Sequence, residues 1–106
     1  MGLERRFVHE SGQYAEMEMG ETALAFTSED IGESNLLPYG FRKNDPAELP
    51  AGIEIALVAE DVEVAFEAAV NAGATKIAGP KVKPWGQAVA YVRDLDGVLV
   101  EIAGEM

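Results

Sequence analysis

The chain of 106 residues contains no cysteine and a single histidine, His9. The absence of cysteine excludes a disulfide scaffold, a thiolate metal site and a cysteine nucleophile. One histidine in an early strand-like segment gives no support to a Ser-His-Asp arrangement, and we interpret it as a solvent-side strand residue. A glycine-rich phosphate loop is also missing. The sequence therefore assigns no catalytic residue.

Positive charge is scarce: 8 Lys and Arg stand against 19 Asp and Glu, a formal net charge of −11. Without a basic stripe the chain is not expected to bind nucleic acid, and anionic membranes would repel it. No apolar segment is long enough to be a signal peptide core or a membrane span. We expect a cytoplasmic, single-domain protein over residues 1–106, whose acidic surface weakly favours neutral or cationic small ligands.

The second half of the chain has the order β-α-β-β-β. Strands are predicted over residues 53–59, 75–82, 87–93 and 98–103, the last two forming a hairpin. Asp61 is a candidate N-cap and Gly73 a left-handed C-terminal cap of the helix between the first two strands. The helix carries one apolar stripe at helical spacing, formed by Val62, Ala65, Phe66, Ala69 and Val70.

The first third indicates a three-stranded meander over residues 7–8, 13–19 and 22–27, with turns at Ser11-Gly12 and Gly20-Glu21. Ala15, Met17 and Met19 alternate onto one face. Residues 29–52 are rich in proline and glycine and are interpreted as a long connector. Its apolar side chains are expected to pack on other parts of the protein: Leu36, Leu37, Tyr39 and Phe41. The order of strands and glycine-containing turns in the meander is similar to that of the last three strands of the second half, which indicates an internal repeat.

The second half carries the residues of a family resemblance. They are Ile53–Val62 with the following helix, Ala72-Gly73-Ala74, Pro84-Trp85-Gly86-Gln87, and Tyr91–Ile102. This pattern resembles the glyoxalase, bleomycin-resistance and extradiol-dioxygenase (vicinal oxygen chelate) superfamily over nearly all of residues 53–104. Over residues 2–27 it matches only the tail of that family's first module.

The resemblance implies an α+β fold in which a curved mixed sheet surrounds a cavity. A complete βαβββ module (residues 53–104) would follow a partial βββ module (residues 3–28) that lacks its first strand and helix, with residues 29–52 as the connector. We therefore expect a single domain with three parts: a partial first module in residues 1–28, a connector in residues 29–52 and a complete second module in residues 53–106. Family members often form dimers with sites shared between chains, and we expect a homodimer because the partial module leaves an apolar sheet face without cover.

The resemblance also implies positions for metal ligands, one on the first and one on the last strand of each module. Those of the second module fall on Glu54, where the family usually has histidine, and on Glu101. In the first module one falls on Ala25, which cannot coordinate, and the other on the missing strand. Two carboxylates are a poor transition-metal site, and a hard cation needs six or more oxygens. We therefore expect no metal cofactor, with Glu101 the best ligand candidate if a divalent metal is bound.

Strand alternation predicts a ligand-binding face. Ala88, Ala90 and Val92 are expected under the helix, which turns Gln87 and Tyr91 to the opposite side. Glu54 and Glu101 are expected to share that side, with Trp85 as an aromatic lining residue. The alternatives are a solvated Glu101, a Glu101 paired with Arg93 or with an arginine of a partner chain, and core roles for the two aromatic residues.

Three functions remain open on this sequence. The first is a metal-free protein that binds a small molecule in a sheet-lined cavity, of the kind that sequesters drugs or hydrophobic cations. The second is a metal-dependent glyoxalase-like lyase or isomerase, or a dioxygenase, whose site is completed across a dimer. The third is a ligand-responsive interaction domain.

Overall fold

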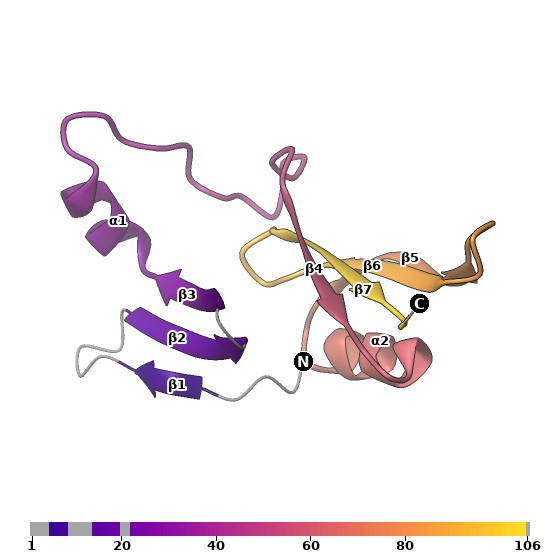
Figure 1. The fold of residues 1–106 in the computed structure, drawn as a ribbon. Coiled ribbons are helices and arrows are strands. Elements are labelled where there is room, and N and C mark those ends of the chain that lie inside the picture. The colour runs from indigo at the N-terminus through magenta and orange to yellow at the C-terminus, as the bar shows by residue number, and fades with distance from the viewer. Residues whose placement is uncertain (1–4, 9–13, 20–21, 106) are drawn as a thin grey trace. The chain divides into compact units, whose positions relative to one another are not determined.

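The protein has an α+β fold with nine secondary-structure elements in the part of the chain that the structure describes (Figure 1). The structure is a computed structural model that describes residues 5–8, 14–19 and 22–105. It divides into two compact units, Gly2–Lys43 and Asn44–Met106, each described below by itself. Neither of the two helices in the described residues has the length and apolar content needed to cross a bilayer.

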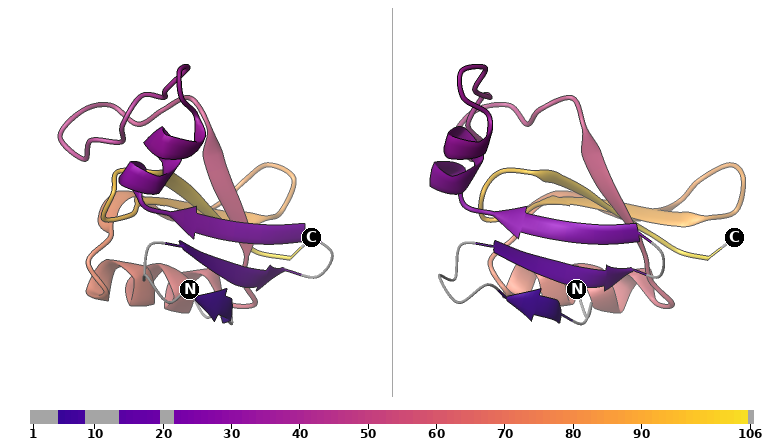
Figure 2. Two further views of the ribbon diagram at one scale, coloured as in Figure 1. Left: turned by 90° about the vertical axis from the view of Figure 1, so that its left-hand side faces the viewer. Right: turned by 60° about the vertical axis from the view of Figure 1, so that its left-hand side comes forward.

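The unit Asn44–Met106 confirms the β-α-β-β-β order expected for residues 53–104. Its elements are β4 (Glu54–Val58), α2 (Val62–Asn71), β5 (Thr75–Val82), β6 (Ala88–Arg93) and β7 (Leu99–Ala103). The sheet order is β4-β7-β6-β5. β4 runs parallel to β7, and the other two pairings are antiparallel. The sheet is therefore mixed, and α2 lies across one of its faces (Figure 2).

The core of this unit lies between α2 and the sheet. Ile102 and Ala90 are fully buried, and the α2 side chain of Phe66 is only 7% exposed. The buried cluster consists of Val62, Phe66, Ala69, Ala90, Val92, Val100 and Ile102. Every second residue of β6 and β7 thus faces the helix, as the alternation predicts. The opposite face of the sheet carries Glu54, Tyr91 and Glu101.

Local signals set the ends of α2. The Asp61 carboxylate accepts a hydrogen bond from the Val64 amide at 3.1 Å and so satisfies one free donor of the first turn. Gly73 follows the C-cap with φ of +111°, a conformation that side-chain-bearing residues adopt rarely. Both caps confirm the sequence-based expectation.

Arg93 fastens the segment before β4 to the β6–β7 turn. Its guanidinium donates to the carbonyl oxygens of Gly97 at 2.9 Å, Pro46 at 3.2 Å and Asp45 at 3.3 Å. A Cβ at Gly97, where φ is +91°, would come within 2.9 Å of the Arg93 Nη2 atom. The turn therefore needs glycine both for its backbone conformation and for this close approach.

The unit Gly2–Lys43 contains an antiparallel meander of β1 (Arg5–Val8), β2 (Tyr14–Met19) and β3 (Thr22–Thr27). This confirms three strands in the first third of the chain. In the β2–β3 register Ala15 pairs with Phe26 and Met17 with Leu24. The predicted turns at 11–12 and 20–21 and the expected position of His9 lie outside the described residues, as do the side chains of β2.

The connector expected over residues 29–52 contains a helix that the sequence analysis did not predict, α1 (Glu29–Asn35). The Ser28 hydroxyl caps it by accepting from the Ile31 amide at 3.3 Å. α1 buries no residue and contains Gly32, so it lacks the apolar stripe that would have revealed it. Phe41 packs against Gly32, whereas Leu37 and Tyr39 are largely exposed.

Candidate functional site

Glu54, Tyr91 and Glu101 lie on the face of the four-stranded sheet opposite α2. Glu101 in β7 pairs with Tyr91 in β6, and Glu54 in β4 pairs with Leu99, two residues before Glu101. Cross-strand partners share a face, and so do residues two apart on one strand. The strand pairing therefore brings these three side chains together, and we call them the carboxyl-pair site.

The carboxyl group of Glu54 makes ionisation of Glu101 less favourable. The pKa of Glu101 is raised above its ordinary value, first by burial, and then by a hydrogen bond to Glu54 and by the charge of that residue. Lys83 acts in the opposite direction. A second carboxyl group beside Glu101 disfavours the ionised form of Glu101. A cation placed between the two side chains would offset this repulsion.

Tyr91 supplies an aromatic ring and a hydroxyl beside the carboxyl pair. Burial raises its pKa, and the charges of Glu101 and Glu54 raise it further. The phenol therefore stays protonated at physiological pH and can donate a hydrogen bond. Ala56, the β4 partner of Glu101, contributes only a methyl group to this face.

Gln87 and Trp85 form a second group at the end of the β5–β6 hairpin. The Trp85 Nε1–H donates to Gln87 Oε1 at 2.9 Å, and Gln87 Nε2 donates to the Gly104 carbonyl at 2.7 Å. Both polar ends of the Gln87 amide are thus used within the protein, while the Trp85 side chain remains 60% exposed. Among the described residues no hydrogen bond joins this group to the carboxyl pair.

Arg93 is not the counter-charge of Glu101. It shares the face of Tyr91, but its guanidinium is occupied by three backbone carbonyls around the β6–β7 turn. Of the alternatives considered for Glu101, pairing with Arg93 is not observed among the described residues. Glu101 interacts with another acid instead, which makes its environment more favourable to a cation.

The described residues do not form a metal centre. Nowhere among them do three or more histidine, cysteine, aspartate or glutamate side chains gather as a metal would require. The carboxyl-pair site offers two carboxyl oxygen donors and a phenol, with Lys83 close enough to influence Glu101. Transition metals prefer imidazole ligands, and hard cations such as calcium need more oxygen ligands than these two carboxyl groups and one phenol supply. Ala25, on β3, has no donor atom in its side chain, and His9 lies outside the described residues.

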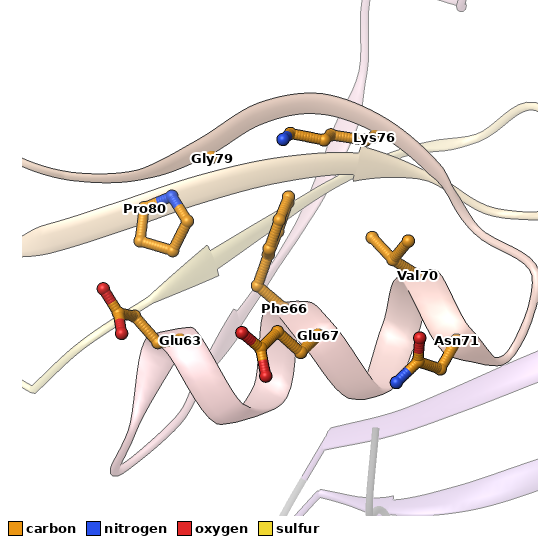
Figure 3. Close-up of a pocket in the computed structure, with 8 residues that line it drawn as sticks. All are labelled: Glu63, Phe66, Glu67, Val70, Asn71, Lys76, Gly79 and Pro80. Atoms are coloured by element: carbon orange, nitrogen blue, oxygen red, sulfur yellow. The ribbon is translucent and has the colours of Figure 1, made fainter.

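A groove of about 500 Å³ lies elsewhere, between α2 and β5 (Figure 3). The Lys76 ammonium lies above the Phe66 ring, 5.9 Å from its centroid, within cation–π range. The lining residues are Glu63, Phe66, Glu67, Val70, Asn71, Lys76, Gly79 and Pro80. None of the sequence-predicted site residues borders this groove. Sequence patterns could not reveal it, because it depends on how a helix packs beside a strand.

Comparison with known protein families identifies the superfamily to which this fold belongs. The model of the Glyoxalase/Bleomycin resistance protein/Dioxygenase superfamily matches residues 1–102. The chain belongs to this superfamily. The match spans both units and confirms the resemblance found in residues 53–104. No curated protein matches the sequence of this superfamily member.

Solved structures similar to this superfamily member share its fold. A glyoxalase-related enzyme from Fulvimarina pelagi aligns with a TM-score of 0.79 and 20% identity, covering 98% of this chain and 71% of that one. A family enzyme from Burkholderia phytofirmans PsJN gives 0.71 and 18%, with 100% and 82% covered. TioX from Micromonospora sp. ML1 gives 0.67 and 22%, with 99% and 80% covered. At these identities the likeness extends to the fold alone.

Proposed function

We propose that this superfamily member binds a small cationic ligand at the carboxyl-pair site without the help of a metal. The observation that carries the proposal is that strand pairing places Glu54 and Glu101 beside Tyr91, on the sheet face opposite α2. An amine or an aromatic cation would pair with both carboxylates. No catalytic step is part of this proposal.

The surroundings of the pair favour a ligand that joins a cation to an apolar body. Tyr91 offers a ring for stacking and a hydroxyl for a hydrogen bond. The net charge of −11 lowers the free energy of a cation near the protein and raises that of an anion. The superfamily description names bleomycin resistance proteins as well as enzymes, so membership by itself is compatible with binding as the whole function.

Fluorescence titration with the aromatic cation proflavine tests the proposal. We expect Glu101→Gln and Glu54→Gln each to raise the dissociation constant about tenfold or more, since hydrogen bonds to charged groups contribute roughly 1.5–3 kcal/mol. Glu60→Gln is the matched control, because it removes the same charge at an exposed position just before α2. Binding should also weaken on acidification, as protons compete for the carboxylates.

Two results would contradict the proposal. One is the absence of saturable proflavine binding, and the other is an equal affinity in all three variants, which would mean that net charge alone attracts the dye. Elemental analysis addresses the metal-dependent alternative. About one equivalent of a transition metal per chain, lost in Glu101→Ala, would favour a metal-dependent lyase, isomerase or dioxygenase instead.

A further inference from the structure

Charge is separated across the sheet face that carries the carboxyl-pair site. The strand order is β4-β7-β6-β5, and Glu54 and Glu101 lie on β4 and β7, at one side of the sheet (Figure 1). β6 contributes the uncharged side chains of Val89 and Tyr91 to this face. β5, at the opposite edge, contributes Lys81, which pairs with Val89. A ligand that lies across this face therefore meets carboxylates at one end and a lysine at the other.

Lys83 adds a second positive charge to the β5 side of this face. Its backbone amide donates to the Gln87 carbonyl at 2.8 Å, which continues the β5–β6 pairing beyond the end of β5. Residues two apart on an extended segment share a face, so Lys83 lies on the same side as Lys81. Lys83 is half-buried whereas Lys81 is exposed. Of the two lysines, Lys83 is therefore the one more closely packed on the sheet.

Lys83 also influences the carboxyl pair through its charge. Burial and Glu54 raise the pKa of Glu101, and the Lys83 ammonium acts against that rise. Neighbouring strands lie about 4.8 Å apart, so β5 is separated from β7 by about 10 Å, with β6 between them. The Tyr91 ring lies in this interval. The spacing suits a ligand whose two opposite charges are held apart by a flat apolar body.

The lysines on this face are available to a ligand. Half of the eight Lys and Arg residues of the chain lie in residues 68–93, a segment that contains no Asp or Glu. Lys76 belongs to the α2 face of the sheet, and Arg93 is engaged by backbone carbonyls. Among the described residues, neither Lys81 nor Lys83 forms an ion pair with a carboxylate. The β5 side of the face therefore attracts an anionic group, although the chain as a whole is acidic.

We propose that the ligand of the carboxyl-pair site is a zwitterion whose cationic and anionic groups lie at opposite ends of a flat apolar body. The cationic group pairs with Glu54 and Glu101, and the apolar body lies on the Tyr91 ring. Lys83, with Lys81 beside it, holds the anionic group, for example a carboxylate. The inference rests on the proposed function and adds to it a second charge of stated sign and place. Lys83 then determines specificity, because it attracts a zwitterion and repels a simple cation.

Displacement of proflavine by two probes that differ in one group tests the inference. 4-(Aminomethyl)benzoate carries an ammonium and a carboxylate on opposite sides of a benzene ring, and its methyl ester carries the ammonium alone. We expect the wild-type chain to bind the acid about fivefold more tightly than the ester. Lys83→Gln should weaken binding of the acid and strengthen binding of the ester, and Lys81→Gln should act in the same direction. A lysine needed only for folding would instead weaken both probes on replacement.

Lys76→Gln is the matched control, because it removes the same charge from β5 on the face that packs against α2, and it should keep the wild-type preference. A wild-type chain that binds proflavine without preferring the acid would overturn the inference and leave the cation site standing. So would a preference that survives in both Lys83→Gln and Lys81→Gln, or one that is lost equally in Lys76→Gln. Absence of proflavine binding would contradict the proposed function itself, and the inference with it.

Discussion

Glu101 lies in a strand whose two faces have different surroundings, one in the core and one at the carboxyl-pair site. Its neighbours Val100 and Ile102 point into the core under α2, while its own carboxyl group meets Glu54 on the other face. Burial of an ionised carboxylate beside a second one is unfavourable, and the protein responds by holding a proton more tightly there. The folded state therefore binds this proton more strongly than the unfolded state does, which gives stability a pH dependence.

Replacement of Glu101 by Gln should stabilise the folded protein at neutral and higher pH. With the pKa raised from 4.5, the favourable contribution of the protonated group is complete at low pH and is lost as the pH rises through the folded-state pKa. The uncharged variant avoids this loss, and we expect a gain of about 0.5–1 kcal/mol at about pH 8 that disappears near pH 4. Urea unfolding at several pH values measures it. A variant less stable than wild type at high pH would contradict the assignment.

At the scale of elements, α2 packs on one face of its sheet and does not cover the other. Three of its side chains, Val62, Phe66 and Ala69, are buried in the core. The helix is only ten residues long, so its own hydrogen bonds stabilise it weakly and its caps and packing matter more. Asp61 begins the helix directly after β4, the strand that carries Glu54.

Substitution of Asp61 by Ala should destabilise this unit by about 1 kcal/mol, within the range of about 0.5–2 kcal/mol for lost N-caps. The cause is the Val64 amide, which in the variant no longer has the Asp61 carboxylate to donate its hydrogen bond to. Glu60→Ala serves as control, because it removes the same charge next to the helix without removing a cap. Thermal unfolding followed by circular dichroism gives both values. Equal effects of the two substitutions would show that charge, rather than the hydrogen bond, is responsible.

At the scale of the whole molecule, the net charge of −11 opposes contact between copies. Salt screens this repulsion between copies. We therefore expect self-association to strengthen as sodium chloride rises from about 0.05 M to about 0.5 M, because the screening length falls below about 10 Å. Light scattering across this range is the measurement. Dissociation on addition of salt would indicate an interface held by ion pairs.

The sequence alone determined most of the unit Asn44–Met106. The alternation in residues 87–93 and 98–103, the apolar stripe of the helix, the Asp61 cap and Gly73 each encode geometry that a few neighbouring residues decide. Structure and family comparison confirm that order. The homodimer, the cytoplasmic location and the ligand role of Glu54, Gln87, Trp85, Tyr91 and Glu101 stay predictions.

Only the tertiary structure decided which of these residues meet. Glu54 and Glu101 interact because β4 is parallel to β7 in one particular register, and Arg93 reaches Pro46, 47 residues away, instead of Glu101. Trp85 and Gln87 bond to each other at the hairpin end rather than to the carboxyl pair. α1 was not predicted because a short helix that buries no residue shows no apolar side chains at helical spacing. Periodicity reports which side of an element is buried, whereas register and long-range contacts depend on how complete elements pack together.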